Sequence, residues 1–307
     1  MLNLPHVLQA VRLKPCIPAP SEAVSKVLNL TKDADADIRV VAQIIARDPG
    51  LTSQLLRQAN SSLYGCATPT SSVNAACIRL GLKRVRAAVI NQHVVSGLGK
   101  ACPPGYDPKQ YWQSALATSV AAVNLATQLI PAAAEDAGTA GLLCDVGIGM
   151  MAFAIPNEYG PALKEASGLH KLDAVERRRI GVTHSQVGAA ILGDWKLDQR
   201  IIDAVAHHHV QDSAKETSGE TKLFNGIIRV AATLSGIATD GSDMELVESL
   251  FAQAAELGPN ADKLVDKLMG ELVEHIQKAA TAFSVEMGGT TEMEKNFAAL
   301  AREKTPV

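Results

Sequence analysis

Aromatic residues are scarce in this chain, since Phe, Trp and Tyr make up only 4 % of its 307 residues. β-Sheets favour aromatic and β-branched side chains, whereas the alanine that recurs along this sequence suits close packing between helices. No segment alternates apolar and polar residues over enough positions to predict a strand. We therefore predict an all-α fold, with an N-terminal helical bundle joined to a second helical core and further helices at the C-terminal end.

Paired cysteines are also absent. The five cysteines are odd in number and widely spaced, and no two form a Cys-x-x-Cys pair. This pattern excludes a disulfide framework and a cysteine-based zinc site, and it indicates reduced thiols. The sequence does not open with a basic and then apolar leader, so we expect a cytoplasmic protein.

The longest apolar run, from Gly138 to Pro156, is long enough to span a bilayer but contains Asp145 and several glycines. A lone membrane helix tolerates a central carboxylate poorly. We interpret the run as buried protein interior and expect no membrane partner.

No strong excess of one charge marks the chain, whose net charge is −3. Residues 1–210 carry 20 Lys and Arg against 16 Asp and Glu, and residues 211–307 carry 9 against 16. Nucleic-acid-binding proteins concentrate positive charge on one face, so this balance argues against a nucleic-acid partner. Arg79, Lys83 and Arg86 are spaced to share a helix face and form a candidate basic contact face, although such groups usually belong to a solvated surface.

Helix boundaries are well marked. Asp48–Pro49 and Asp107–Pro108 each place an N-cap aspartate before a proline in the first helical turn. Gly81 is predicted to end one helix, and Pro131 another. Further helix starts are predicted at Ser21, Asp37, Ser71 or Ser72, Lys83, Asp173 (with Glu176 as a capping partner), Thr183 and Asp198.

Three groups could carry chemistry. Asp145 stands among glycine and apolar residues, where a carboxylate needs a cation, a proton or several hydrogen bonds. It is either a metal ligand or general base, or a carboxylate satisfied by backbone groups or an arginine. His184, one turn into its helix, is either a ligand or a satisfied core residue. Of His207, His208 and His209, at most two can serve one centre, because consecutive helical residues point about 100° apart.

The segments "VVAQIIARDPGLTSQLLRQANSSLYG" and "SSVNAACIRLGLKRVR" resemble the front half of the HDOD family. The segments "YWQSALATSVAA", "LLCDVGIGMM", "GVTHSQVGAAILGDWKL" and "IIDAVAHHH" resemble its remaining blocks, in order. The resemblance covers residues 10–210, which divide into an N-terminal helical subdomain (10–105) and an HD-like subdomain (106–210). Residues 211–307 lie outside it and are predicted to form an acidic helical extension.

The HDOD family is related to the HD and HD-GYP metal phosphohydrolases, and the resemblance implies which site residues remain. Ser114 stands where the enzymes have their first histidine, Cys144 replaces the histidine of the His-Asp pair, and Ile148 replaces a lysine. Because two nitrogen ligands are lost, we expect no bound metal, no cofactor and no catalysis. What remains is a vestigial HD-like pocket of Ser114, Cys144, Asp145, His184, His208 and His209.

The resemblance thus implies a bacterial regulatory module of signal transduction that acts by binding protein partners. If its pocket is only structural, Asp145 should be hydrogen-bonded internally, and His184 should face a carbonyl or another side chain. One alternative is a metal-dependent phosphohydrolase or cyclic-nucleotide phosphodiesterase with an altered site. A second alternative is a regulator that binds nucleic acid or a nucleotide.

Overall fold

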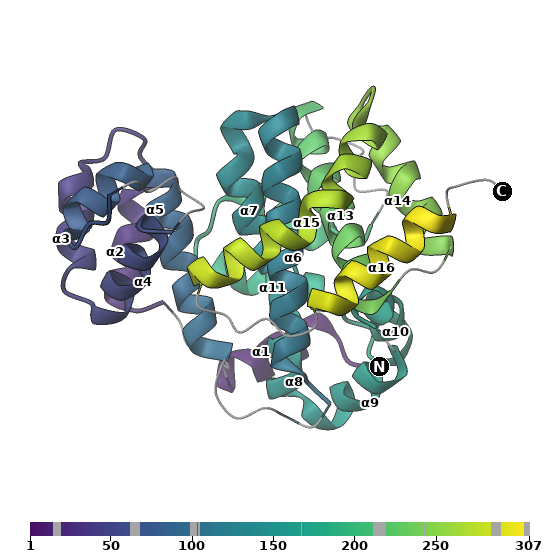
Figure 1. The fold of residues 1–307 in the computed structure, drawn as a ribbon. Coiled ribbons are helices and arrows are strands. Elements are labelled where there is room, and N and C mark those ends of the chain that lie inside the picture. Colours follow the sequence, from purple (N-terminus) through teal and green to yellow (C-terminus); the bar gives the residue numbers. More distant parts are fainter. Residues whose placement is uncertain are drawn as a thin grey trace. The chain divides into compact units, whose positions relative to one another are not determined.

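The computed structural model describes residues 1–14, 20–61, 68–98, 103, 105–166, 168–210, 219–241, 244–283 and 290–303 (Figure 1). Within these ranges all regular structure is helical and there is no strand, so the all-α prediction is confirmed. The chain forms two compact units. The first contains residues 1–16, 101–277 and 287–307, and the second contains residues 17–100 and 278–286.

The second unit contains α2 (Glu22–Leu30), α3 (Ile38–Ile45), α4 (Pro49–Ala59) and α5 (Val73–Leu98). The side chains of Ser21, Asp37 and Asp48 accept hydrogen bonds from the first backbone N–H groups of α2, α3 and α4. These starts confirm the predicted caps. An N-cap can be predicted from the sequence because it depends only on a polar side chain and on the backbone N–H groups of the residues that follow it.

A break at Gly81 divides α5. Gly81 has φ 76° and ψ 163°, a left-handed conformation that glycine adopts without strain. The predicted helix end is therefore present as a kink. Arg79 precedes this kink and Lys83 and Arg86 follow it, so the three do not share one continuous helix face. The Arg79 guanidinium donates to the carbonyl oxygens of Ala59 (3.0 Å) and Thr68 (2.9 Å).

The first unit is built around α6 (Pro108–Leu129), whose N-cap is Asp107 as predicted. The chain continues through the short helix η2 (Pro131–Ala133), α7 (Ala134–Leu143), α8 (Val146–Ala154), α9 (Pro156–Ala166), η3 (Leu169–Lys171), α10 (Leu172–Arg179), α11 (His184–Asp194) and α12 (Gln199–His207). Thr183 caps α11 in a capping box with Gln186, and Asp198 caps α12. Residues 101, 102 and 104, just before the predicted subdomain boundary at 105/106, lie outside the described residues.

Helices from both ends of the chain complete this unit, and of these only α1 was not expected from the sequence. Helix α1 (Leu4–Leu13) packs on α8 and α11, and the Leu2 N–H donates to the Ile180 carbonyl at 2.8 Å. Helix α13 (Gly219–Asp240) packs along α6 (Figure 1). The acidic segment thus contributes to the same core as the HD-like helices, and it continues through α14 (Met244–Leu257), α15 (Ala261–Phe283) and α16 (Thr290–Glu303).

Of the residues described, one stretch, 131–154, is long and apolar enough to cross a membrane, and 94 % of its apolar 18-residue window is buried inside the protein. It corresponds to η2, α7 and α8, which agrees with its interpretation as protein interior.

Two glycines in this stretch allow the close helix contacts that position Asp145. A Cβ at Gly141 would lie 2.9 Å from the Ser119 Cα on α6, and one at Gly147 would lie 2.0 Å from the His184 carbonyl oxygen on α11. No side chain fits at either position without moving backbone. Asp145, between these glycines, is therefore held between α6 and α11.

Candidate functional site

Four of the predicted pocket residues converge in the first unit. Asp145 lies between α7 and α8, His184 is the first residue of α11, and His208 and His209 follow α12. One nitrogen or oxygen atom of each lies within 4.8 Å of the others. Asp145, His184 and His208 are at most 7 % exposed, and His209 is half-buried. We call these four residues the four-donor centre.

Four of the six separations between the donor atoms suit a single cation. His184 Nε2 lies 3.4 Å from His208 Nε2, 3.2 Å from His209 Nε2 and 3.4 Å from Asp145 Oδ1. His208 Nε2 is also 3.4 Å from Asp145 Oδ1. Ligands at the corners of a tetrahedral zinc site, with bonds of about 2.0–2.1 Å, are about 3.3–3.4 Å apart. Four of the separations in the centre therefore match the edges of such a site.

Hydrogen bonds on the far side of the rings orient two of these histidines. His184 Nδ1 lies 2.8 Å from Glu176 Oε2, and His208 Nδ1 lies 2.8 Å from the Val205 carbonyl oxygen. Since both partners are acceptors, each Nδ1 carries the proton, and Nε2 is left to face the centre. Bare nitrogen lone pairs this close repel one another unless a proton or a cation lies between them.

The carboxylates around the centre favour positive charge there. Burial alone would raise the pKa of Asp145, but hydrogen bonds from His184 and His208 outweigh it and hold that pKa well below its usual value. Burial opposes protonation of His184, yet Glu176 and Asp145 raise its pKa to about 10. Burial and the neighbouring imidazoles hold the pKa of His209 well below its usual value.

Ser114 and Cys144, which the resemblance places at histidine positions of the enzymes, are not among the four converging donors. Ser114 Oγ donates to Asp145 Oδ2 at 3.3 Å and lies 3.1 Å from Ser235 Oγ on α13. Cys144 Sγ instead donates to the Gly141 carbonyl at 3.2 Å. Burial and the nearby Asp145 raise the pKa of the Cys144 thiol well above its usual value, so it is a neutral thiol facing its own helix.

His207, the first histidine of the run, is not among the donors that converge. Its Nδ1 contacts the Asp203 carbonyl oxygen at 2.8 Å. Asp145 and His184 have the internal hydrogen bonds expected of a structural pocket, and the same bonds orient metal ligands in proteins. The prediction that this pocket binds no metal rested on two lost imidazoles and stays untested. The donors that the structure brings together are four of the six residues of the predicted pocket.

Sequence reasoning missed three residues that support the centre: Glu176, Tyr159 and Ser235. Glu176 was predicted to cap α10, but it accepts hydrogen bonds from Tyr159 and His184. Glu176 lies four residues after the buried Leu172, so the two residues share one face of α10. This spacing is visible in the sequence and indicates that the Glu176 side chain faces the core. Ser235 contacts Ser114 across 121 positions of sequence, which no local pattern predicts.

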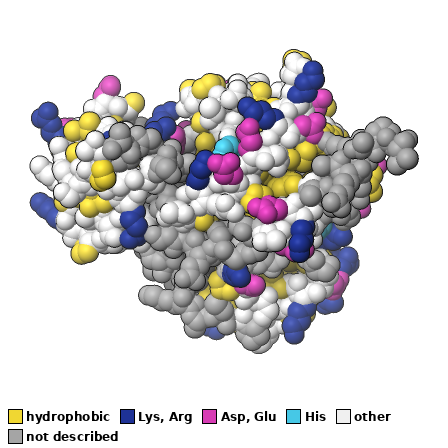
Figure 2. All heavy atoms as spheres, viewed as in Figure 1, with side chains coloured by type: hydrophobic (Ala, Val, Ile, Leu, Met, Phe, Trp, Pro, Cys, Tyr) yellow, Lys and Arg dark blue, Asp and Glu magenta, His cyan; other side chains and the backbone are white. Residues whose placement is uncertain are grey.

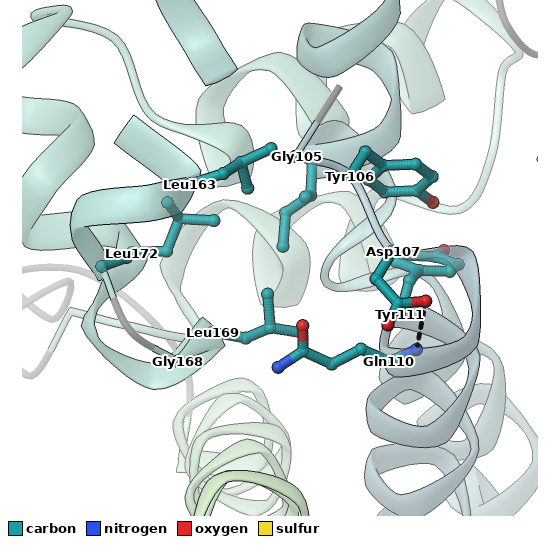
Figure 3. Close-up of a pocket in the computed structure, with 11 residues that line it drawn as sticks. Gly105, Tyr106, Asp107, Gln110, Tyr111, Leu163, Gly168, Leu169 and Leu172 are labelled. Atoms are coloured by element: carbon teal, nitrogen blue, oxygen red, sulfur yellow. Dashed lines mark hydrogen bonds between the residues drawn. The ribbon is translucent and has the colours of Figure 1, made fainter. Parts of the chain in front are cut away.

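The first unit also contains a small pocket that was not predicted (Figure 3). Leu163, Leu169 and Leu172 point into it, and the Gln110 amide reaches across its lower edge. The Gln110 Nε2 donates to Asp240 Oδ1 at 3.2 Å. The lining is completed by Gly105, Tyr106, Asp107, Tyr111, Ile148, Ala166 and Gly168. Ile148, which the resemblance places where the enzymes have a lysine, lines this pocket.

Comparison with solved structures supports the fold. An HDOD domain protein of unknown function from Geobacter sulfurreducens is 22 % identical, with a TM-score of 0.71 over 91 % of this chain and 98 % of that one. A protein from Shewanella amazonensis SB2B, provisionally named a phosphohydrolase, is 20 % identical, with a TM-score of 0.70 over 90 % of this chain and 97 % of that one. At these identities the likeness shows the fold alone.

Comparison by sequence identifies the family. An uncharacterized protein of Treponema pallidum (strain Nichols) is 25 % identical over 207 residues, which are 65 % of this chain and 39 % of that protein. The chain thus spans well under half the length of this relative. The model of the HDOD domain matches residues 17–211, close to the predicted 10–210. This match covers more than half of the sequence, and the chain therefore belongs to the HDOD family.

Proposed function

We propose that this chain is a regulatory module of bacterial signal transduction that binds a protein partner and does not hydrolyse phosphate esters. The proposal combines its family with the state of its HD-like pocket. A metal phosphohydrolase must hold a cation and leave it a coordination position for the attacking water. The question is therefore whether the four-donor centre leaves such a position.

The convergence of four protein donors supports a non-catalytic centre. Asp145, His184, His208 and His209 provide the number of ligands that a closed, structural tetrahedral site uses, whereas catalytic zinc sites use three and a water. Where the enzymes place a further nitrogen ligand, Ser114 offers a neutral hydroxyl already engaged with Asp145 and Ser235. Among the described residues, no second group of metal-ligating side chains converges there.

The donor set fits one divalent cation of the zinc class. When bound, such an ion would neutralise the Asp145 carboxylate and polarise any ligand that reaches it. Its four donors come from the starts of α8 and α11 and the end of α12, so it would join three helix ends. In this role the ion stabilises the fold, and metal binding is coupled to folding.

Hydrolysis assays test the non-catalytic part directly. The purified chain is loaded with Zn²⁺ or Mn²⁺ and given bis(4-nitrophenyl) phosphate or a cyclic dinucleotide, alongside the Asp145→Ala variant. We expect no turnover beyond that of the variant. Metal-dependent cleavage that Asp145→Ala abolishes would instead establish the phosphohydrolase alternative.

The surface of the second unit supports the binding part. Ile78 on α5 is 58 % exposed and Val40 on α3 is 43 % exposed, so large aliphatic side chains lie at the surface of this unit. No Asp or Glu occurs between Pro49 and Tyr106, a region that contains Lys83 and five other basic residues. In Figure 2, the surface over α2–α5 shows more dark blue than magenta, with yellow hydrophobic atoms among them. Such a surface fits a partner protein with an acidic, partly apolar face.

Site-specific photocrosslinking in the bacterial host tests the docking surface. A crosslinking residue at Ile78 should capture one defined partner protein, while one at exposed Met244 on α14 should not. Loss of that crosslink in a Lys83→Glu variant would support an acidic partner face. Capture of nucleic acid at Ile78, with affinity that falls steeply with salt, would favour the nucleic-acid alternative.

A further inference from the structure

Glu176 on α10 is a fully buried acidic residue that the HD-like signature does not include. Its side chain is 0 % exposed, and so is that of His184. Carboxylates are almost never this deeply buried unless they are paired. The partners of Glu176 therefore indicate what it does.

The two carboxylate oxygens of Glu176 have different partners. Oε1 accepts a hydrogen bond from the Tyr159 hydroxyl at 2.5 Å. Oε2 accepts from both the backbone N–H and the ring Nδ1 of His184, each at 2.8 Å. Tyr159 is itself fully buried on α9, so Glu176 is fixed from one side and fixes His184 on the other. A line of hydrogen bonds thus runs from α9 through α10 to the four-donor centre.

Charge balance links Glu176 to the same cation. Glu176 and Asp145 bring two negative charges into the interior, and Arg177, next to Glu176, is paired with Asp173 at 2.7 Å. Two protonated imidazoles could balance these charges, but His184 and His208 face each other with their Nε2 atoms 3.4 Å apart. One divalent cation bound by neutral imidazoles would balance both carboxylates without that repulsion.

We propose that Glu176 is a positioning residue of the four-donor centre, holding the proton of His184 on Nδ1 so that Nε2 faces the cation, with Tyr159 anchoring Glu176. The inference rests on the proposed structural role of the centre. Partner carboxylates of this kind orient metal-bound histidines and increase their basicity. If Glu176 only caps the start of α11 through the His184 N–H, its replacement should not change metal affinity.

Zn²⁺ affinity, measured by competition with a chromophoric chelator, tests this role in the full chain. Glu176→Gln should lower the affinity by roughly 10–100-fold, as outer-sphere substitutions do. Tyr159→Phe keeps the ring and removes one hydrogen bond, so its loss should be smaller, roughly tenfold at most. Glu158→Gln is the matched control, because Glu158 precedes Tyr159 on α9 and is exposed. The Zn²⁺ affinity of this variant should equal that of the wild type.

Nitrogen NMR of the Zn²⁺-loaded wild type provides a second readout that a purely structural role would not move. The His184 ring should carry its proton on Nδ1 and its metal on Nε2. If Glu176→Gln does not fold, the inference is tested by this spectrum of the wild type and by the Zn²⁺ affinity of Tyr159→Phe. Unchanged affinity in Glu176→Gln, a proton on His184 Nε2, or no Zn²⁺ binding by the wild type would overturn the inference. Phosphate-ester hydrolysis by the wild type would contradict the proposed function, but it would not change the predicted order of Zn²⁺ affinities among the wild type and the variants.

Discussion

Gly147→Ala is the substitution that most directly perturbs the crossing of α8 and α11. The new Cβ would lie 2.0 Å from the His184 carbonyl oxygen, 2.8 Å from the His184 carbonyl carbon and 3.0 Å from the Gly188 nitrogen. All three atoms belong to the backbone of α11, so no side-chain rotation relieves the contact. An ordinary contact begins at 3.4 Å, and the two helices would have to separate by roughly 1.4 Å.

Two consequences follow from that separation. Overpacking of a core typically lowers the unfolding free energy by about 1–3 kcal/mol. Because the new Cβ would meet backbone atoms, which cannot move aside as a side chain can, we expect a loss at the upper end of this range, about 2–3 kcal/mol. The displaced carbonyl belongs to His184, so the same shift would move a donor of the centre away from Asp145. Metal sites tolerate errors of only about 0.2 Å in ligand distance, so Zn²⁺ affinity should fall as well.

Urea denaturation followed by circular dichroism measures the first effect, and chelator competition the second. Gly193→Ala is the control, since it lies on the same helix α11 and a Cβ there meets nothing within 4 Å. That substitution should be neutral or stabilise by up to about 1 kcal/mol, because alanine favours helix. A Gly147→Ala protein as stable as Gly193→Ala would refute the close-crossing argument.

Three further predictions concern other parts of the fold. Arg79→Ala removes two charge-assisted hydrogen bonds to the carbonyls of Ala59 and Thr68, so it should destabilise the second unit by about 1–3 kcal/mol in urea, whereas exposed Lys83→Ala should be neutral. Burial raises the pKa of the Cys77 thiol to about 11; the reactive thiolate is therefore scarce at pH 8, and peptide mass spectrometry should find Cys77 unlabelled by maleimide in the native chain and labelled in urea. Rapid native labelling would contradict its burial. A chain ended at residue 211 loses α13, which packs along α6 and supplies Ser235 to Ser114. It should therefore be unfolded or aggregated by size-exclusion chromatography, and a folded monomer would show that the acidic segment is dispensable.

The local features of this fold could be predicted from the sequence. Asp48, Asp107 and Thr183 mark helix starts because a cap depends on a few neighbouring residues. Gly81 marks a break because only its own backbone conformation is involved. Helix α1 was not predicted, because the first helix start was assigned to Ser21, after the proline-rich segment that follows α1.

The candidate site was predictable only in part. Asp145 and His184 stand out as polar residues in apolar surroundings, but spacing could not choose which two of the three consecutive histidines face them. That choice depends on where α12 ends against α11. Glu176 and Ser235 were not predicted as site residues, because their partners lie on other helices and are brought near only by tertiary packing.

X-ray absorption at the zinc edge of the Zn²⁺-loaded chain tests the central claim most directly, because it counts the atoms bound to the ion. We expect one Zn²⁺ per chain with four nitrogen and oxygen ligands at about 2.0 Å. We also expect the loss of this signal in a variant that lacks His184 and His209. Five or six ligands, with exchangeable water among them, would contradict a closed structural centre.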